Sequence, residues 1–144
     1  DASKVLGLDI SPKAVELANT DNGSLRFQSE VADLFNLPAH HRSAFDWVWE
    51  HTCFCAIEPG RRDQYVEAVH TALKPDGQLL AVFYRDPYDE EHPPGGGPPH
   101  CSTVDELTER FEGSGRFKII ESYVPKASYE GRESLEQMMR LKRL

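Results

Sequence analysis

Two aspartates in this sequence follow runs of residues that are typical of strands. Asp9 closes the apolar run within residues 4–10, and Asp33 follows the alternating run 25–31. A carboxylate offers two oxygens to the neighbouring hydroxyls of a ribose, and Asp9 has the position for this role. Asp33 has the position to bind the exocyclic amine of an adenine. Together they indicate a nucleoside site, with two alternatives left open: a strand-end acid that stabilises the next helix, and a turn-forming aspartate.

A histidine and two cysteines follow another strand-like run. Residues 51–55 read His-Thr-Cys-Phe-Cys, and His100 precedes a third cysteine. Histidine titrates near neutral pH, so His51 or His100 is a candidate to accept the proton of a neutral thiol; a surface or loop histidine is the alternative for each. We expect no metal site, because structural zinc sites favour two or more residues between paired cysteines, and a Cys-x-Cys leaving a strand directs its side chains to opposite faces.

The composition limits the classes of function. The chain has 144 residues, enough for one domain, with 39% hydrophobic and 28% charged residues, as in ordinary globular proteins. The 16 Lys and Arg against 24 Asp and Glu give a net charge of −8, which argues against nucleic acid or an anionic membrane as partner. We therefore expect a monomer that acts on a small molecule. An anionic acceptor needs local positive charge, for which Arg85 is a candidate, with an exposed loop cation as the alternative.

The sequence also bears on the cellular location. No apolar run approaches the ~20 residues that span a bilayer, and the first residues resemble no signal peptide. Three cysteines are too few for a disulfide framework, so reduced thiols are expected. These features predict a cytoplasmic protein.

Strand-like and helix-like segments alternate along the chain. Apolar or alternating runs predict strands, and capped runs with apolar residues at helical spacing predict helices. The predicted strands are residues 4–10, 25–31, 44–50, 78–84 and 117–124, and the predicted helices are residues 13–20, 61–73 and 103–111. This order predicts an α/β fold with a parallel sheet, right-handed crossovers and helices on both faces. Ligands of such sheets bind at the carboxyl ends of the strands.

Three local features matter for the site. The helix 61–73 is expected to expose Arg62 opposite its apolar face. Residues 85–101 are rich in proline and glycine and have no periodicity, which predicts a long loop and a candidate lid. Residues 128–144 fit a helix or a final edge strand equally well.

Several of these segments resemble a known family. Residues 5–12, 32–35, 45–52 and 73–80 are similar to successive motifs of class I S-adenosylmethionine-dependent methyltransferases. Residues 53–59, with the Gly-Gly-Pro-Pro run 96–99, narrow the resemblance to the thiopurine methyltransferase-like group and its halide and thiol methyltransferases. The resemblance implies one methyltransferase domain over residues 1–144, with a Rossmann-like sheet that has helices on both faces.

The resemblance implies roles for particular residues. The activity implied is methyl transfer from S-adenosyl-L-methionine to a small soft nucleophile: a thiol or thiolate, a halide or a thiopurine-like sulfur. The implied cofactor-binding residues are Asp9 for the ribose hydroxyls, Ile10 against the adenine, Asp33 and Leu34 for the adenine amine and its surroundings, and Glu50, His51 and Thr52 for the methionine end. His51 and His100 are the implied catalytic candidates, and many halide-group relatives have a tyrosine at the position of His100.

The resemblance also implies an incomplete domain. The first strand and the glycine-rich loop of the family would precede Asp1, so they are expected to be absent from this chain. In this topology the first strand joins the two halves of the sheet, and its loss leaves two inner edges unpaired. We therefore expect the chain alone to bind the cofactor weakly or not at all.

Two other classes of function remain open. A nicotinamide-dependent dehydrogenase also places an acid such as Asp9 after its second strand, although it does not need Asp33. A truncated or degenerate fold that only binds a nucleoside is the second alternative.

Overall fold

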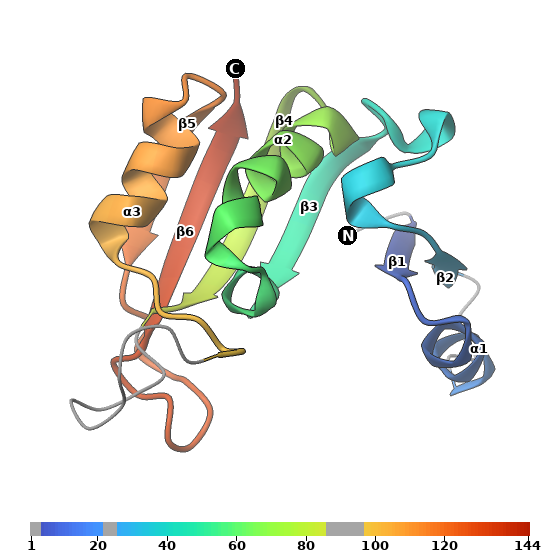
Figure 1. Cartoon of the computed structure of the whole chain (residues 1–144), viewed down its shortest axis with the longest axis horizontal. Helices are drawn as coiled ribbons and strands as arrows, with labels where there is room; N and C mark the ends of the chain where they lie inside the picture. Colours follow the sequence, from blue (N-terminus) through green and yellow to red (C-terminus); the bar gives the residue numbers. More distant parts are fainter. Residues whose placement is uncertain (1–3, 22–25, 86–96) are drawn as a thin grey trace. The chain divides into compact units, whose positions relative to one another are not determined.

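The structure, a computed structural model, describes residues 4–21, 26–85 and 97–144 (Figure 1). The chain divides into two compact units, Asp1–Ala39 and His40–Leu144. Most of the predicted lid at 85–101 lies outside the described residues. No helix among those described is long and apolar enough to cross a membrane.

The first unit is a strand, helix and strand. It contains β1 (Val5–Asp9), α1 (Pro12–Asp21), β2 (Phe27–Val31) and a single 3-10 turn, η1 (Leu34–Asn36). The two strands pair in parallel, and α1 starts where expected, because Ser11 Oγ accepts from the backbone amide of Ala14 at 3.3 Å. This unit confirms the predicted crossover between two parallel strands.

The second unit is a four-stranded sheet with the strand order β3-β4-β6-β5. The strands are β3 (Phe45–His51), β4 (Leu73–Tyr84), β5 (Phe117–Tyr123) and β6 (Glu136–Arg143), and the helices are α2 (Arg62–Ala72) and α3 (Val104–Thr108), which continues into a π turn, η5 (Glu109–Gly113). Three 3-10 turns accompany them: η2 (Ala39–His41), η3 (Phe54–Ala56) and η4 (Pro59–Arg61). Both helices lie on the same face of this sheet (Figure 1).

The core of the second unit lies between its sheet and its helices. Alternate residues of β4 and β6 are buried towards the helices, and a chain of phenylalanine rings fills the space with centroids 5.4–6.0 Å apart. β3 does not follow the usual pattern of apolar residues inside and polar residues outside. Trp47 and Trp49 are 52% and 58% exposed, whereas Glu50 is buried. The polar end of β3 is therefore built into the covered face.

The last strand differs from its prediction. β6 lies between β4 and β5 and runs antiparallel to both, so the expectations of an edge strand and of a wholly parallel sheet are wrong for this segment. Its alternate residues Met139 and Leu141 are fully buried, as befits a strand inside a sheet. β4 contains an irregularity near its start, where Asp76 has a φ of 63° and the pairing with β3 changes register.

Candidate functional site

The carboxyl ends of β1 and β2 carry two of the predicted site residues. Asp9 is the last residue of β1 and pairs in register with Val31, two positions before Asp33. The backbone amide of Ala32 donates to the carbonyl oxygen of Asp9 at 3.0 Å and joins the two strand ends. The aspartates thus follow neighbouring strands of one parallel pair.

Each aspartate holds one local amide. Asp9 Oδ1 accepts from the amide of Ser11 at 2.8 Å, and Asp33 Oδ1 accepts from the amide of Phe35 at 2.8 Å. Both side chains are exposed, and no donor within the described part of the chain contacts either Oδ2. Each carboxylate is therefore fixed in orientation and retains an oxygen that can accept from a ligand.

Two apolar residues stand beside these acids. Ile10 is 74% exposed, and Leu34 is partly exposed at the start of η1. Oriented carboxylates next to exposed apolar surface match the hydroxyl and amine donors and the flat ring of an adenosine. The hydrogen-bond acceptors of the first unit therefore fit the adenosine portion of the implied cofactor.

Glu50 occupies the covered face at the end of β3. Its carboxylate is 2% exposed, and Oε1 accepts from the amides of Cys53 at 2.5 Å and Phe54 at 2.9 Å. Oε2 is buried and has no hydrogen-bond partner among the described residues. Burial raises the pKa of Glu50 from 4.5 to about 7, even though the two amides act in the opposite direction. This side chain fixes the turn that follows β3.

We expect the Glu50→Gln variant to remove a pH dependence of stability. The folded-state pKa of about 7 lies above the ordinary value of 4.5, so the unfolded chain ionises first as the pH rises. The wild-type free energy of unfolding should therefore fall, relative to the variant, by about 3 kcal/mol between pH 4.5 and pH 8. Urea denaturation of both proteins across this range measures the difference. A constant difference would show that Glu50 ionises normally.

His51 and Thr52 follow Glu50 at the end of β3. His51 points to the opposite face from Glu50, and its exposed ring lies at 17° to the ring of Tyr129, with centroids 6.0 Å apart. Thr52 has a φ of 58°, and its amide donates to the carbonyl oxygen of Val82 at 3.1 Å. The predicted methionine-end residues are thus divided between the two faces of the sheet.

His100 lies against the turn after β3. Its ring is buried, and its amide donates to the carbonyl oxygen of Cys55 at 2.6 Å. His100 Nε2 has no hydrogen-bond partner in the described chain, and the nearest carboxylate oxygen, Glu58 Oε1, is 3.7 Å away. The amide of Ser102 donates to the carbonyl oxygen of Arg85 at 2.7 Å. The segment 100–102 therefore joins the carboxyl ends of β3 and β4.

Arg62 holds this segment in place. The side chain is 1% exposed, so the prediction that it lies on the outer face of its helix is wrong. Nη1 donates to both oxygens of Glu106 at 2.9 Å and to the carbonyl of Cys101 at 3.0 Å, and Nη2 donates to the carbonyl of His100 at 3.1 Å. The guanidinium also lies 4.7 Å from the Phe54 ring centroid. Helical spacing alone gave no signal of these long-range partners.

The two cysteines of this turn remain thiols at neutral pH. Loss of solvent contact and the nearby Glu50 raise the pKa of Cys53 to about 11, and the same causes raise the pKa of Cys55. A thiolate is the form that binds metals and acts as a nucleophile. The pair is therefore poorly suited to either role.

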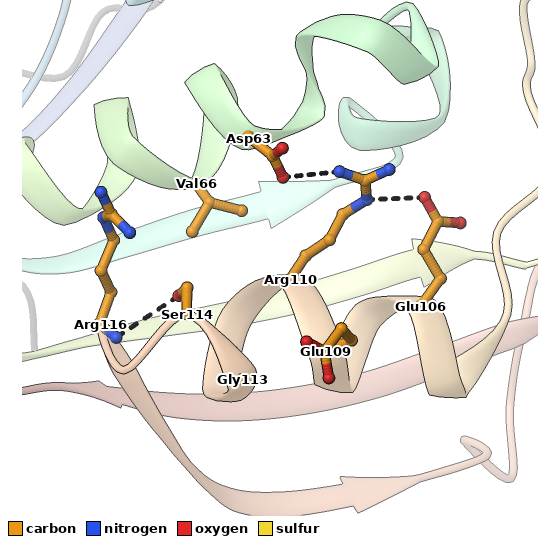
Figure 2. Close-up of a pocket in the computed structure, with 8 residues that line it drawn as sticks. All are labelled: Asp63, Val66, Glu106, Glu109, Arg110, Gly113, Ser114 and Arg116. Atoms are coloured by element: carbon orange, nitrogen blue, oxygen red, sulfur yellow. Dashed lines mark hydrogen bonds and ion pairs between the residues drawn. The ribbon is translucent and has the colours of Figure 1, made fainter.

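A surface pocket of about 580 Å³ lies elsewhere, between α2 and α3 (Figure 2). Figure 2 shows Arg110 between two acids: it donates to Asp63 at 2.6 Å and to Glu106 at 2.8 Å. The pocket contains none of the predicted site residues. The ion pairs of Arg110 with Asp63 and Glu106 connect α2 with α3 and η5.

Comparison with known proteins adds to this geometry. The family model described as Thiopurine S-methyltransferase (TPMT) matches residues 1–138. The chain belongs to the thiopurine S-methyltransferase family. It is 32% identical over 145 residues to "Probable thiol methyltransferase 2" of Arabidopsis thaliana, covering 96% of this chain and 60% of that protein. It is 30% identical over 146 residues to thiocyanate methyltransferase 1 of Arabidopsis thaliana, covering 97% and 60%.

The solved structures agree on the fold of this thiopurine S-methyltransferase family member. A SAM-dependent methyltransferase from Methanosarcina mazei superposes with a TM-score of 0.74 at 20% identity, covering 98% of this chain and 82% of that one. The Rossmann-like class I methyltransferase fold is thereby confirmed. The chain spans 60% of the length of the two plant relatives.

Proposed function

We propose that this chain forms the adenosine-binding and acceptor-binding part of an S-adenosylmethionine-dependent methyltransferase that acts on small, soft sulfur nucleophiles. The main support is the family match over residues 1–138, together with the two carboxylates at neighbouring strand ends. The plant relatives named for thiol and thiocyanate methyl transfer support a sulfur acceptor. A halide is a second acceptor of the same soft, anionic character.

The cofactor side of the proposal rests on the first unit. Bound S-adenosylmethionine supplies an activated methyl group on a sulfonium. Asp9 would accept hydrogen bonds from its ribose hydroxyls, and Asp33 would accept from the adenine amine, with Ile10 and Leu34 beside the ring. The amides of Ser11 and Phe35 hold both carboxylates in orientation before any ligand arrives. Such preorganisation lowers the cost of binding.

The acceptor side of the proposal rests on the segments after β3 and β4. A thiolate or halide needs positioning and a dry pocket but no base, because the sulfonium is already a good leaving group. His100 Nε2 is buried without a partner among the described residues, which suits a group that accepts the proton of a neutral thiol. His51 is a second candidate for this proton. Glu50 Oε1 instead holds the backbone of the turn.

Methyl transfer by the complete gene product should depend on the protonation state of the acceptor. We expect turnover of a thiol, thiocyanate and iodide, with His100→Asn lowering the rate for the neutral thiol by about 10²-fold or more and leaving iodide turnover within about twofold. Gas chromatography of the volatile methylated products measures all three. Equal losses for thiol and iodide would show that His100 acts only in packing.

The same preparation tests the competing classes of function. Stabilisation against heat by S-adenosylhomocysteine and not by NAD is the expected result. Stabilisation by NAD alone would replace the proposal with a dehydrogenase, and absence of turnover on every acceptor would favour a non-catalytic module.

We also propose that the protein is a cytoplasmic monomer with a small-molecule substrate. The acidic net charge and the free cysteines support this proposal.

A further inference from the structure

Four side chains from three separate segments meet at the end of the sheet where β3 and β4 finish. Arg132, in the connection between β5 and β6, lies with its guanidinium carbon 4.9 Å from the ring centroid of Tyr84. The same carbon lies 6.0 Å from the ring centroid of Tyr129, and Tyr129 is stacked on His51. The connection that carries Arg132 passes this end of the sheet in Figure 1. The cluster is thus a cation held among aromatic rings.

The connection is fastened in this position by backbone contacts. The amide of Arg85 donates to the carbonyl oxygen of Leu135 at 2.8 Å, and Arg85 Nη2 donates to that of Ser134 at 2.7 Å. Arg85, the predicted source of local positive charge, therefore anchors the segment that presents Arg132. The position of Arg132 follows from this anchoring.

The charge of Arg132 remains available to a ligand. Its side chain is 34% exposed, and Glu136 Oε1, its ion-pair partner, lies 3.6 Å away, beyond hydrogen-bonding distance. Within residues 4–21, 26–85 and 97–144 the guanidinium donates no hydrogen bond. Its field nevertheless reaches the turn after β3, because Arg132 lowers the pKa of Cys55 against the raising effect of burial.

We propose that Arg132 and Tyr129 form the face that recognises the anionic acceptor, and that this face selects a small polarisable sulfur anion, a thiolate or thiocyanate. This inference rests on the proposed methyl transfer. A guanidinium is more weakly hydrated than an ammonium, and the rings of Tyr84 and Tyr129 beside that of Arg132 reduce its contact with water further. It therefore pairs best with an anion that is itself weakly hydrated. The cluster also supplies the positive charge that a protein of net charge −8 needs near such an acceptor.

The kinetic test compares Arg132→Gln with Arg132→Lys in the complete gene product. Arg132→Gln should raise the KM for thiocyanate and for a thiolate about tenfold or more, with kcat within about twofold, because the lost attraction acts on binding of the anion. Arg132→Lys should recover only part of the affinity, because the ammonium keeps the charge but not the planar stacking. Tyr129→Ala should raise the same KM, and Tyr129→Phe should not.

A matched control separates local recognition from net charge. Lys126→Gln removes a positive charge from an exposed residue of the same connection and should leave both KM values unchanged. Binding of S-adenosylhomocysteine should be the same in all variants. A KM that rises equally in Lys126→Gln, or one that stays constant in Arg132→Gln, would overturn the assignment of Arg132.

A binding measurement makes the inference independent of turnover. Titration with sodium thiocyanate at constant ionic strength should shift the nuclear magnetic resonance signal of Arg132 Nε, identified by its loss in Arg132→Lys, whereas sodium chloride should not. If no acceptor is methylated and the signal still shifts, the proposed activity fails and the anion site stands. If turnover occurs and thiocyanate leaves the signal unmoved, the anion site fails and the proposed activity stands.

Discussion

Replacing Asp9 with asparagine is expected to weaken binding of S-adenosylhomocysteine by about 10- to 100-fold, the loss associated with one or two charge-assisted hydrogen bonds. Asparagine retains an oxygen for the amide of Ser11, which Asp9 Oδ1 holds at 2.8 Å. It replaces the second oxygen with an amide nitrogen, which cannot accept from a ribose hydroxyl. The substitution therefore removes the ligand contact while it preserves the local backbone contact.

Isothermal titration calorimetry on the complete gene product measures this loss. Asp33→Asn should weaken binding less, because the adenine amine makes one hydrogen bond where the ribose makes two. Asp105→Asn serves as the control, since it removes an exposed aspartate from the first turn of α3. Unchanged affinity in Asp9→Asn, with an unchanged melting temperature, would restrict Asp9 to its contact with Ser11 and remove the main structural support for an adenosine site.

The elements that the sequence predicted correctly are those with local causes. Ser11 and Thr103 accept from amides three residues ahead, at 3.3 Å and 3.0 Å, and both helices start at these caps. The acids Asp9 and Asp33 could be assigned to strand ends because a short apolar run precedes the first and an alternating run precedes the second, and both runs form strands. Local spacing was sufficient for each of these features.

The features that escaped prediction depend on residues far apart in the chain. β6 is an interior strand because β4 and β5 pair with its two edges, and nothing within residues 128–144 encodes that choice. Tyr129 and Arg132 lie in the same ambiguous stretch, so their approach to Tyr84 had no sequence signal. A buried arginine likewise looks like any exposed one when only helical spacing is considered.

Arg62 gives the second large expected effect. Arg62→Ala should lower the free energy of unfolding by about 3–5 kcal/mol, the range for removing one partner of a buried ion pair. The loss has several sources: the carboxylate of Glu106 and the carbonyls of His100 and Cys101 lose their donor, and the Phe54 ring loses its cation. Arg61→Ala is a matched control, because the neighbouring Arg61 is exposed, and it should change stability by less than about 0.5 kcal/mol.

The Arg62 guanidinium both pairs with Glu106 and donates to the carbonyls of His100 and Cys101, and the Glu106→Gln variant separates these two functions. Glu106→Gln should lower the free energy of unfolding less than Arg62→Ala does, because the carbonyls of His100 and Cys101 keep their donors. The side chain at position 106 also keeps an oxygen for Arg110 Nε, which donates to Glu106 at 2.8 Å. Amide hydrogen exchange at His100, whose amide donates to Cys55, then reports on the segment itself. Exchange should accelerate in Arg62→Ala and stay slow in Glu106→Gln, because the tether to the carbonyls, rather than the ion pair, holds the segment against the end of β3. Equal acceleration in both variants would make the ion pair the cause and leave the carbonyl contacts without a separate role.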